Sequence, residues 1–200
     1  MADTPAVPGL KGTRTEKNLA EAYVAESMAY TRYIYFGKTA KKEEYYHFAN
    51  IFNETADNEL HHAKIYLKLL QNGAVEAGPI SVDPGILKPT LECCKIAASE
   101  EEMEGVKMYR EAAEVAEEEG FHDIADVFNA IASIENHHKE RFDLMAWQIE
   151  NGKVWKRDTP IKWQCLVCGY IFEGTEPPEV CPACSHPYQH FMPADLPSNV

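Results

Sequence analysis

The sequence predicts a mainly α-helical protein in which a four-helix bundle precedes a small metal-bound domain of loops and short strands. Three observations predict this fold class. Apolar residues recur at steps of three and four along four long segments. Acidic side chains and histidines interrupt these apolar faces, and four cysteines form two Cys-x-x-Cys pairs near the end of the chain. A chain of 200 residues suits one good-sized core and a small appendage.

The four helices are expected over residues 15–40, 43–72, 90–119 and 122–151, and glycines follow the last three ends. Residues 1–13 contain two prolines and two glycines and are expected to be a flexible leader. The stretch 73–89, rich in proline and glycine, is too long for a tight hairpin and indicates a crossover. Two helix pairs joined by a crossover give a ferritin-like topology for residues 14–152.

Residues 153–200 show no helical periodicity and contain seven prolines and four cysteines. A domain of under about 50 residues rarely builds a sufficient core, so we expect a metal ion to hold it together.

The net charge and the cysteine content restrict the partners. The formal net charge of −13 repels phosphate backbones and anionic lipids, so we expect no nucleic-acid partner and no membrane. The N-terminal residues lack an apolar signal segment, and no apolar run approaches the roughly 18 residues of a spanning helix. We therefore expect a cytoplasmic protein with reduced cysteines.

Five glutamates occupy positions on the apolar helix faces, where an uncompensated carboxylate costs several kcal/mol. Within Glu59-x-x-His62 and Glu135-x-x-His138, both side chains lie on one helix face. Glu26 and Glu101 each precede one of these pairs by a similar distance along the chain, so the arrangement occurs twice. This is the donor set of di-iron and di-manganese carboxylate bundles. For either Glu-x-x-His pair alone, a solvated helix face is the simpler interpretation; the repeat favours metal. The five glutamates are Glu26, Glu59, Glu101, Glu104 and Glu135.

Glu104 has no counterpart in the first half of the chain. Fe(III) is harder than Fe(II) and prefers oxygen to imidazole, so we hypothesise that oxidation exchanges a histidine for Glu104 at one iron. Tyr33 and Tyr109 follow Glu26 and Glu101 by about two helical turns. They are expected either to donate hydrogen bonds to ligand carboxylates or to pack in the core.

The pairs Cys165-x-x-Cys168 and Cys181-x-x-Cys184 can place four thiolates around one tetrahedral ion. The spacing indicates a metal site but leaves zinc and a single iron both open. Cys93 and Cys94 are adjacent on a helix and are expected to be core thiols.

Over residues 11–192 the chain resembles the rubrerythrin family. The resemblance is carried by the motifs already described and by the segments TRTEKNL, ETADNELHHAK, WQCLVCGY and CPACSHP. It implies a rubredoxin-like C-terminal domain with one Fe bound by Cys165, Cys168, Cys181 and Cys184. It also implies a bundle with two Fe bound by Glu26, Glu59, Glu101, Glu135 and His138, the second iron moving between His62 and Glu104.

The function implied by the resemblance is that of a non-haem di-iron peroxidase in oxidative-stress defence. Hydrogen peroxide is reduced to water, and electrons pass through the rubredoxin-like iron from an external NAD(P)H-dependent reductase or rubredoxin. The chain itself has no G-x-G-x-x-G segment for a dinucleotide. The resemblance implies a head-to-tail homodimer, and we assign catalytic roles to Glu104, His62, Tyr33 and Tyr109. A ferroxidase, or a non-enzymatic electron-transfer module with a structural zinc, are the alternatives.

Overall fold

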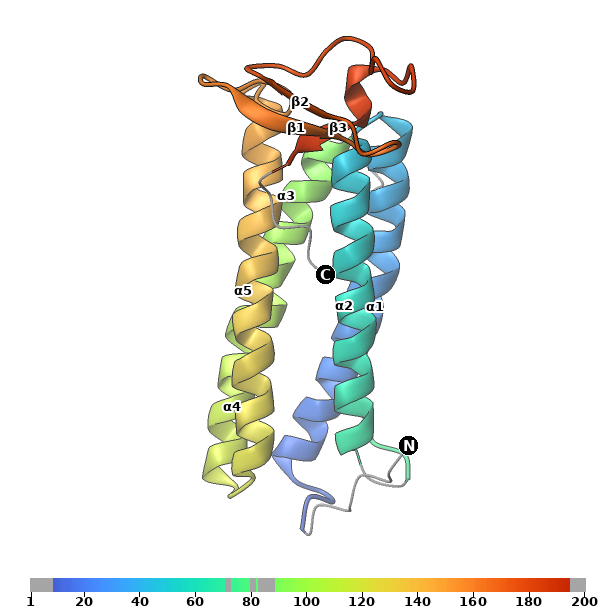
Figure 1. Cartoon of the computed structure of the whole chain (residues 1–200). Coiled ribbons are helices and arrows are strands. Elements are labelled where there is room, and N and C mark those ends of the chain that lie inside the picture. Colours follow the sequence, from blue (N-terminus) through green and yellow to red (C-terminus); the bar gives the residue numbers. More distant parts are fainter. Residues whose placement is uncertain (1–8, 71–72, 80–81, 83–88, 195–200) are drawn as a thin grey trace.

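The protein is a long helical bundle with a small strand domain at one end (Figure 1). The computed structural model describes residues 9–70, 73–79, 82 and 89–194, apart from the side chain of Glu104. The helices are α1 (Arg14–Lys42), α2 (Tyr46–Leu69), α3 (Thr90–Glu100), the π-helix η1 (Glu101–Met108), α4 (Tyr109–Glu118) and α5 (His122–Glu150). The mainly helical fold predicted from the sequence is confirmed.

The helices form two antiparallel pairs, α1 with α2 and the broken helix α3–η1–α4 with α5. Helix α2 ends at the end of the bundle farthest from the strands, whereas α3 begins beside the strands (Figure 1). The connection between them therefore spans the length of the bundle, which confirms the predicted crossover and the ferritin-like topology. None of the described helices is both long enough and apolar enough to cross a membrane.

The helix ends follow local capping chemistry. The Thr13 side chain accepts a hydrogen bond from the Glu16 backbone N–H, and the Glu16 carboxylate accepts one from Gly12 N–H at 2.8 Å, which together fix the start of α1. Leu10, within the expected leader, is fully buried. Gly152 ends α5 with a φ of +61°, a conformation that glycine adopts without strain. The C-cap predicted for the second helix at 72–73 lies partly outside the described residues.

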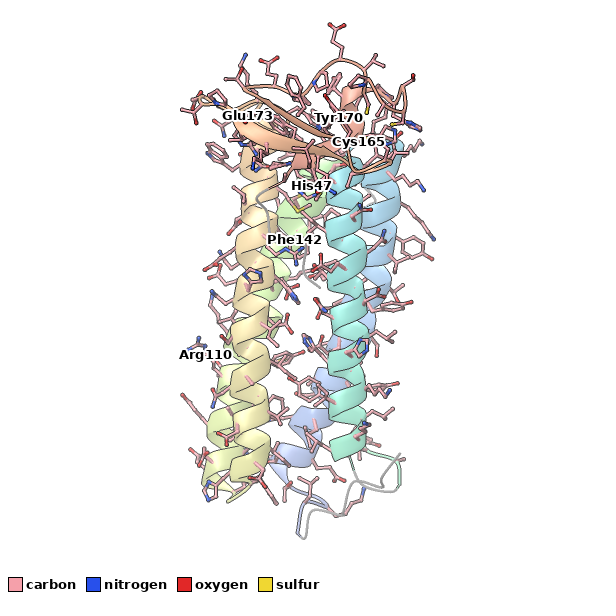
Figure 2. The ribbon with its side chains drawn as sticks, viewed as in Figure 1. His47, Arg110, Phe142, Cys165, Tyr170 and Glu173 are labelled. Atoms are coloured by element: carbon pink, nitrogen blue, oxygen red, sulfur yellow. The ribbon has the colours of Figure 1, made fainter. Side chains whose placement is uncertain are left out.

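Two apolar clusters fill the bundle, one on each side of its middle section. The cluster nearer the strands contains the stacked rings of Phe52 and Phe142, and Phe142 points from α5 into the bundle (Figure 2). Cys93 and Cys94 are fully buried in this cluster, as predicted for core thiols. The other cluster is built around the rings of Tyr66, Tyr109 and Phe128. The middle of the bundle therefore has apolar walls above and below it.

The C-terminal domain is a three-stranded antiparallel sheet of order β2-β1-β3. Its small core contains Trp163, which is fully buried and donates its Nε1–H to the Gly174 carbonyl. Two cysteines are part of the same core, so the cysteine cluster and the apolar packing form one unit. The elements are β1 (Ile161–Cys165), β2 (Ile171–Gly174), the 3-10 helix η2 (Tyr188–His190) and β3 (Phe191–Pro193).

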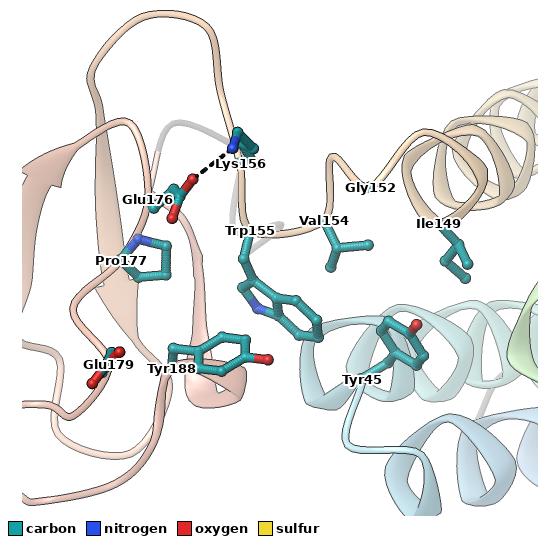
Figure 3. A pocket seen from close by; sticks show the side chains of 10 residues that line it. All are labelled: Tyr45, Ile149, Gly152, Val154, Trp155, Lys156, Glu176, Pro177, Glu179 and Tyr188. Atoms are coloured by element: carbon teal, nitrogen blue, oxygen red, sulfur yellow. Dashed lines mark ion pairs between the residues drawn. The ribbon is translucent and has the colours of Figure 1, made fainter.

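Trp155 joins the two parts of the chain, because its ring belongs to the cores of both. It stacks on Tyr45 with ring centroids 5.4 Å apart and an interplanar angle of 6°, and it meets the Tyr188 ring edge-on (Figure 3). Its Nε1–H donates to the Phe191 carbonyl at 3.2 Å. A pocket of about 410 Å³ opens beside this aromatic stack. The strand domain is thus held on the bundle mainly by aromatic packing.

Candidate metal centres

Four helices bring the predicted carboxylates and histidines into one cluster in the middle of the bundle. Helix α1 supplies Glu26, η1 supplies Glu101, and α2 and α5 each supply one Glu-x-x-His pair. All six side chains are buried, with exposures between 1% and 5%: Glu26, Glu59, His62, Glu101, Glu135 and His138. Uncompensated carboxylates are not stable at this burial, so the cluster requires cations.

The cluster consists of two overlapping groups of four donors, and in each group the donor atoms lie within 4.8 Å of one another. Glu59 and Glu135 belong to both groups and can bridge two ions. Glu26 and His62 complete one group, whereas Glu101 and His138 complete the other. The members of each group are Glu26, Glu59, His62 and Glu135, and Glu59, Glu101, Glu135 and His138.

The distances within the cluster show an approximate twofold arrangement. His62 Nδ1 lies 3.0 Å from Glu59 Oε2 and 2.9 Å from Glu135 Oε1. His138 Nδ1 lies 2.7 Å from Glu135 Oε2 and 3.2 Å from Glu59 Oε1. Glu59 Oε1 and Glu135 Oε1 accept no hydrogen bond from the described residues. Free lone pairs on the two shared carboxylates fit a pair of bridged metal ions.

A π-helical segment carries Glu101 and differs from the continuous α-helix predicted over residues 90–119. The i→i+5 bonding of Glu101–Met108 inserts a wider turn into the helix, and such turns are frequent at functional sites. Gly105, in the middle of this segment, lies against Glu135: an added Cβ would be 2.5 Å from both Cβ and Cγ of Glu135. The absence of a side chain here lets η1 approach the cluster closely.

Two buried tyrosines orient the carboxylates that are not shared. Tyr33 Oη donates to Glu101 Oε1 at 2.7 Å, and Tyr109 Oη donates to Glu26 Oε1 at 2.7 Å. Burial, followed by the nearby carboxylates, raises the pKa of both phenols well above the ordinary value, so both remain donors. Of the two roles considered for these tyrosines, the hydrogen bond to a carboxylate is the one observed, alongside packing in the core.

The protein environment compensates the charge of the carboxylates through the histidines. Burial raises the pKa of Glu26 to about 8 and that of Glu101 well above the ordinary range. Burial opposes protonation of the imidazoles, but the hydrogen bonds that the imidazoles donate to the carboxylates outweigh it and raise the pKa of His62 to about 12 and of His138 to about 9. These shifts favour protonated imidazoles in the absence of metal, and metal binding would displace the protons.

The helical pattern of the sequence did not predict every residue of the carboxylate site, and the side chain of one predicted residue lies outside the described part of the chain. The backbone of Glu104 belongs to η1, but its side chain is outside the part described, so its role stays a prediction. Sequence reasoning missed Gly105, although a glycine inside a helical pattern is a signal of close approach. It also missed Ala25 and Ala29, small residues that flank Glu26 on α1 and line a cavity at the cluster.

The four cysteines of the strand domain form a second metal centre. Cys165 Sγ and Cys184 Sγ are 3.7 Å apart, as are Cys168 Sγ and Cys181 Sγ. A tetrahedron with metal–sulfur bonds of about 2.3 Å has edges of about 3.8 Å. The thiols therefore have the spacing that a tetrahedral ion requires, and all six cysteines of the chain are free of disulfides.

Each Cys-x-x-Cys pair is shaped by the same backbone turn. Gly169 N–H donates to the Cys165 carbonyl and Ser185 N–H donates to the Cys181 carbonyl, both at 2.9 Å. The two donor residues have φ values of +77° and +60°. Glycine accepts this conformation freely, whereas serine adopts it under strain, which the metal-binding turn must offset.

Comparisons with known proteins agree with this arrangement. The profile of the rubrerythrin family matches residues 17–146 and 92–162, and that of the rubrerythrin rubredoxin-like domain matches residues 163–192. Rubrerythrin of Nitratidesulfovibrio vulgaris is 45% identical over 91% of this chain and 95% of the relative, and rubrerythrin of Porphyromonas gingivalis is 42% identical over 92% of each.

Solved structures show the same fold. A mixed-valence structure of nigerythrin has a TM-score of 0.59 and 27% identity, covering 96% of this chain and 94% of nigerythrin. A bacterioferritin of Desulfovibrio desulfuricans, 18% identical with a TM-score of 0.61, covers 70% of this chain and 82% of its own and shares the bundle fold. The donor sets are those of a di-iron carboxylate site and an Fe(Cys)₄ site. With both profiles matched and relatives above 40% identity over nine-tenths of its length, the chain belongs to the rubrerythrin family, generally di-iron proteins of oxidative-stress defence.

Proposed function

We propose that this chain reduces hydrogen peroxide to water at the carboxylate cluster, with electrons supplied through the four-cysteine site. The observation that carries the proposal is the presence of two unlike metal centres in one chain. An ion closed by four thiolates has no open position for substrate and suits electron relay. The carboxylate cluster has a cavity at its side and can leave coordination positions free.

The reaction consumes one hydrogen peroxide, two electrons and two protons and yields two water molecules. When bound, the two iron ions supply the electron pair that breaks the O–O bond. The chain contributes the donor arrangement: Glu59 and Glu135 belong to both donor groups and would hold both ions, and Tyr33 and Tyr109 hold the two other carboxylates by hydrogen bonds. The aromatic clusters on both sides keep bulk water away from the site.

Individual residue roles are part of this proposal. Glu26, Glu59, Glu101, Glu135, His62 and His138 are the proposed ligands of the di-iron site, and Glu104 is proposed to replace His62 upon oxidation. Crystal structures of the oxidised and reduced protein test the exchange, because identical ligands in both states would contradict it. Tyr33, Tyr109, His62 and Glu104 are the residues proposed to act in catalysis.

The electron path favours a second copy of the chain. Tyr46 stacks on His190 of the strand domain at 4.0 Å, and Glu59 lies thirteen residues further along α2. At 1.5 Å per residue, the part of α2 between the strand domain and the carboxylate cluster is about 20 Å long. Since electron transfer slows steeply with distance, we propose a head-to-tail homodimer that brings the cysteine site of one chain to the carboxylate cluster of the other. The electrons come from an external NAD(P)H-dependent reductase or rubredoxin, and free thiols favour the cytoplasm.

The decisive experiment compares two oxidants. The iron-loaded protein is reduced without oxygen and mixed with equimolar hydrogen peroxide or dioxygen, and reoxidation is followed by absorbance. Faster reoxidation by peroxide supports the peroxidase, whereas faster reoxidation by dioxygen supports the ferroxidase alternative. The visible spectrum of the purified protein tests the relay, because an Fe(Cys)₄ centre is red and bleaches upon reduction, and a structural zinc is colourless.

A further inference from the structure

A small cavity connects the carboxylate cluster with the surface between α1 and η1. Its volume is about 20 Å³, and roughly 10–15 Å³ is enough for one water molecule. Its outer wall contains the half-buried residues Ala25, Ala29 and Glu100. Its inner wall is formed by the buried carboxylates Glu26, Glu59, Glu101 and Glu135. A molecule in this cavity therefore lies directly against the proposed metal ligands.

The opening exists because the residues around it are small. Ala25 and Ala29 are four residues apart on α1 and lie on the same face of the helix. On the opposite side Gly105 has no side chain, and an added Cβ would be 3.3 Å from Glu101 Oε2. A branched side chain at position 29 would extend into the cavity and fill it.

One residue that lines the cavity, Glu100, is part of an ion pair. The Arg32 guanidinium on α1 pairs with the carboxylate of Glu100, the last residue of α3. Their side chains are only 15% and 19% exposed. Arg32 follows Ala29 by three residues and so lies one turn further along the same face. Since Glu100 also lines the cavity, the pair connects α1 and α3 next to the cavity.

We propose that this cavity is the substrate entrance and that the Arg32–Glu100 ion pair is its lid, admitting hydrogen peroxide and excluding hydroperoxides with bulky alkyl groups. The proposal rests on the proposed peroxidase function. It assigns Ala29 and Arg32 as specificity-determining residues that supply no ligand atom to either metal centre. Two structural facts support the size limit: the cavity holds about one water-sized molecule, and Glu100, which lines it, forms an ion pair with Arg32.

The test uses the iron-loaded, reduced full chain and two small probes. Ala29→Leu fills the entrance, and Thr31→Leu is the matched control because Thr31 is an exposed residue of the same helix outside the cavity. Reoxidation by hydrogen peroxide and association of nitric oxide are both followed by stopped-flow absorbance, after iron content has been matched. We expect Ala29→Leu to slow both processes at least tenfold and Thr31→Leu to leave both unchanged.

The second variant, Arg32→Ala, removes the lid and leaves the small residues in place. We expect it to raise the reoxidation rate with tert-butyl hydroperoxide several-fold relative to the rate with hydrogen peroxide. The proposed entrance is contradicted if Ala29→Leu binds nitric oxide at the wild-type rate. It is also contradicted if Arg32→Ala shows the same ratio of the two reoxidation rates as the wild type. Slower peroxide reoxidation with unchanged nitric oxide association also counts against it, since the defect then lies in the chemistry. If the wild-type protein does not react with peroxide, the proposed function fails, and nitric oxide association still tests the entrance.

Discussion

Replacing Tyr33 by phenylalanine tests whether hydrogen bonds to the carboxylates stabilise the metal site. The Tyr33 hydroxyl is buried and donates to Glu101 Oε1 at 2.7 Å. A hydrogen bond to a charged group contributes roughly 1.5–3 kcal/mol, and its loss leaves a buried carboxylate oxygen without its donor. Because phenylalanine keeps the ring, packing against Phe142 at 5.2 Å is retained and little else changes. We expect the free energy of unfolding to fall by about 1.5–3 kcal/mol.

Tyr66, in the apolar cluster on the other side of the carboxylates, provides a control. Its hydroxyl is also buried but has no hydrogen-bond partner among the described residues. Tyr66→Phe therefore removes a buried polar group without breaking a hydrogen bond. We expect the free energy of unfolding to change by less than about 0.5 kcal/mol or to increase. Thermal unfolding of the iron-loaded variants by circular dichroism measures the difference, at roughly 2–4 °C per kcal/mol for a chain of this size. Equal losses for Tyr33→Phe and Tyr66→Phe would refute this reasoning.

Four further predictions address the close approach of η1, the interface between the two domains, the helix cap and the metal ions. Gly105→Ala places a methyl group 2.5 Å from Glu135 Cβ, so we expect reduced iron binding to the bundle with an unchanged Fe(Cys)₄ spectrum, measured by iron analysis and absorbance. Trp155→Ala removes the aromatic stack that joins the two domains. We expect faster proteolysis of the chain after residue 152, while the red colour of the Fe(Cys)₄ centre is retained. Equal cleavage rates for the wild type and the variant would contradict this. Glu119→Gln weakens the bonds that the Glu119 carboxylate accepts from Thr15 Oγ1 and N–H at 2.6 and 2.9 Å. The hydrogen bond from the Thr15 hydroxyl lowers the pKa of Glu119 below 4.5. The ionised carboxylate therefore stabilises the fold fully above pH 4.5, and this stabilisation is lost as the pH falls through the lowered pKa. We expect the difference in unfolding free energy between wild type and variant, measured by urea unfolding, to shrink in acid. Chelation of the bundle iron should lower the unfolding temperature. The loss in unfolding free energy should be about 4 kcal/mol if the metal was present at 1,000 times its Kd, and added Fe(II) should restore the unfolding temperature.

The ligand pattern could be predicted from the sequence because it depends on local geometry. Glu59 and His62 are three residues apart, and any α-helix places such residues on one face. The same holds for Glu135 and His138. The Cys-x-x-Cys pairs are equally local, since a single turn fixes the positions of both thiols. Each of these groups is therefore visible in a few consecutive residues.

The pairing between helices could not be predicted in the same way. Tyr33 follows Glu26 on α1, yet it donates to Glu101 on η1; Tyr109 lies on the same broken helix as Glu101, yet it donates to Glu26. These exchanges depend on how the helices are rotated and spaced, and helical periodicity contains no information about either. The side chain of Glu104 lies outside the described residues, so the ligand exchange stays a prediction.

The sequence by itself determined the helical periods, the repeated carboxylate and histidine pairs and the thiolate spacing, because these follow from interactions within a few residues. Only the tertiary structure decided that the helix carrying Glu101 has a π segment, that Gly105 meets Glu135, and that Arg32 pairs with Glu100 beside the cluster. The physical reason is that these features arise where four helices must surround buried charge. There, close packing and charge compensation act between segments far apart in the chain.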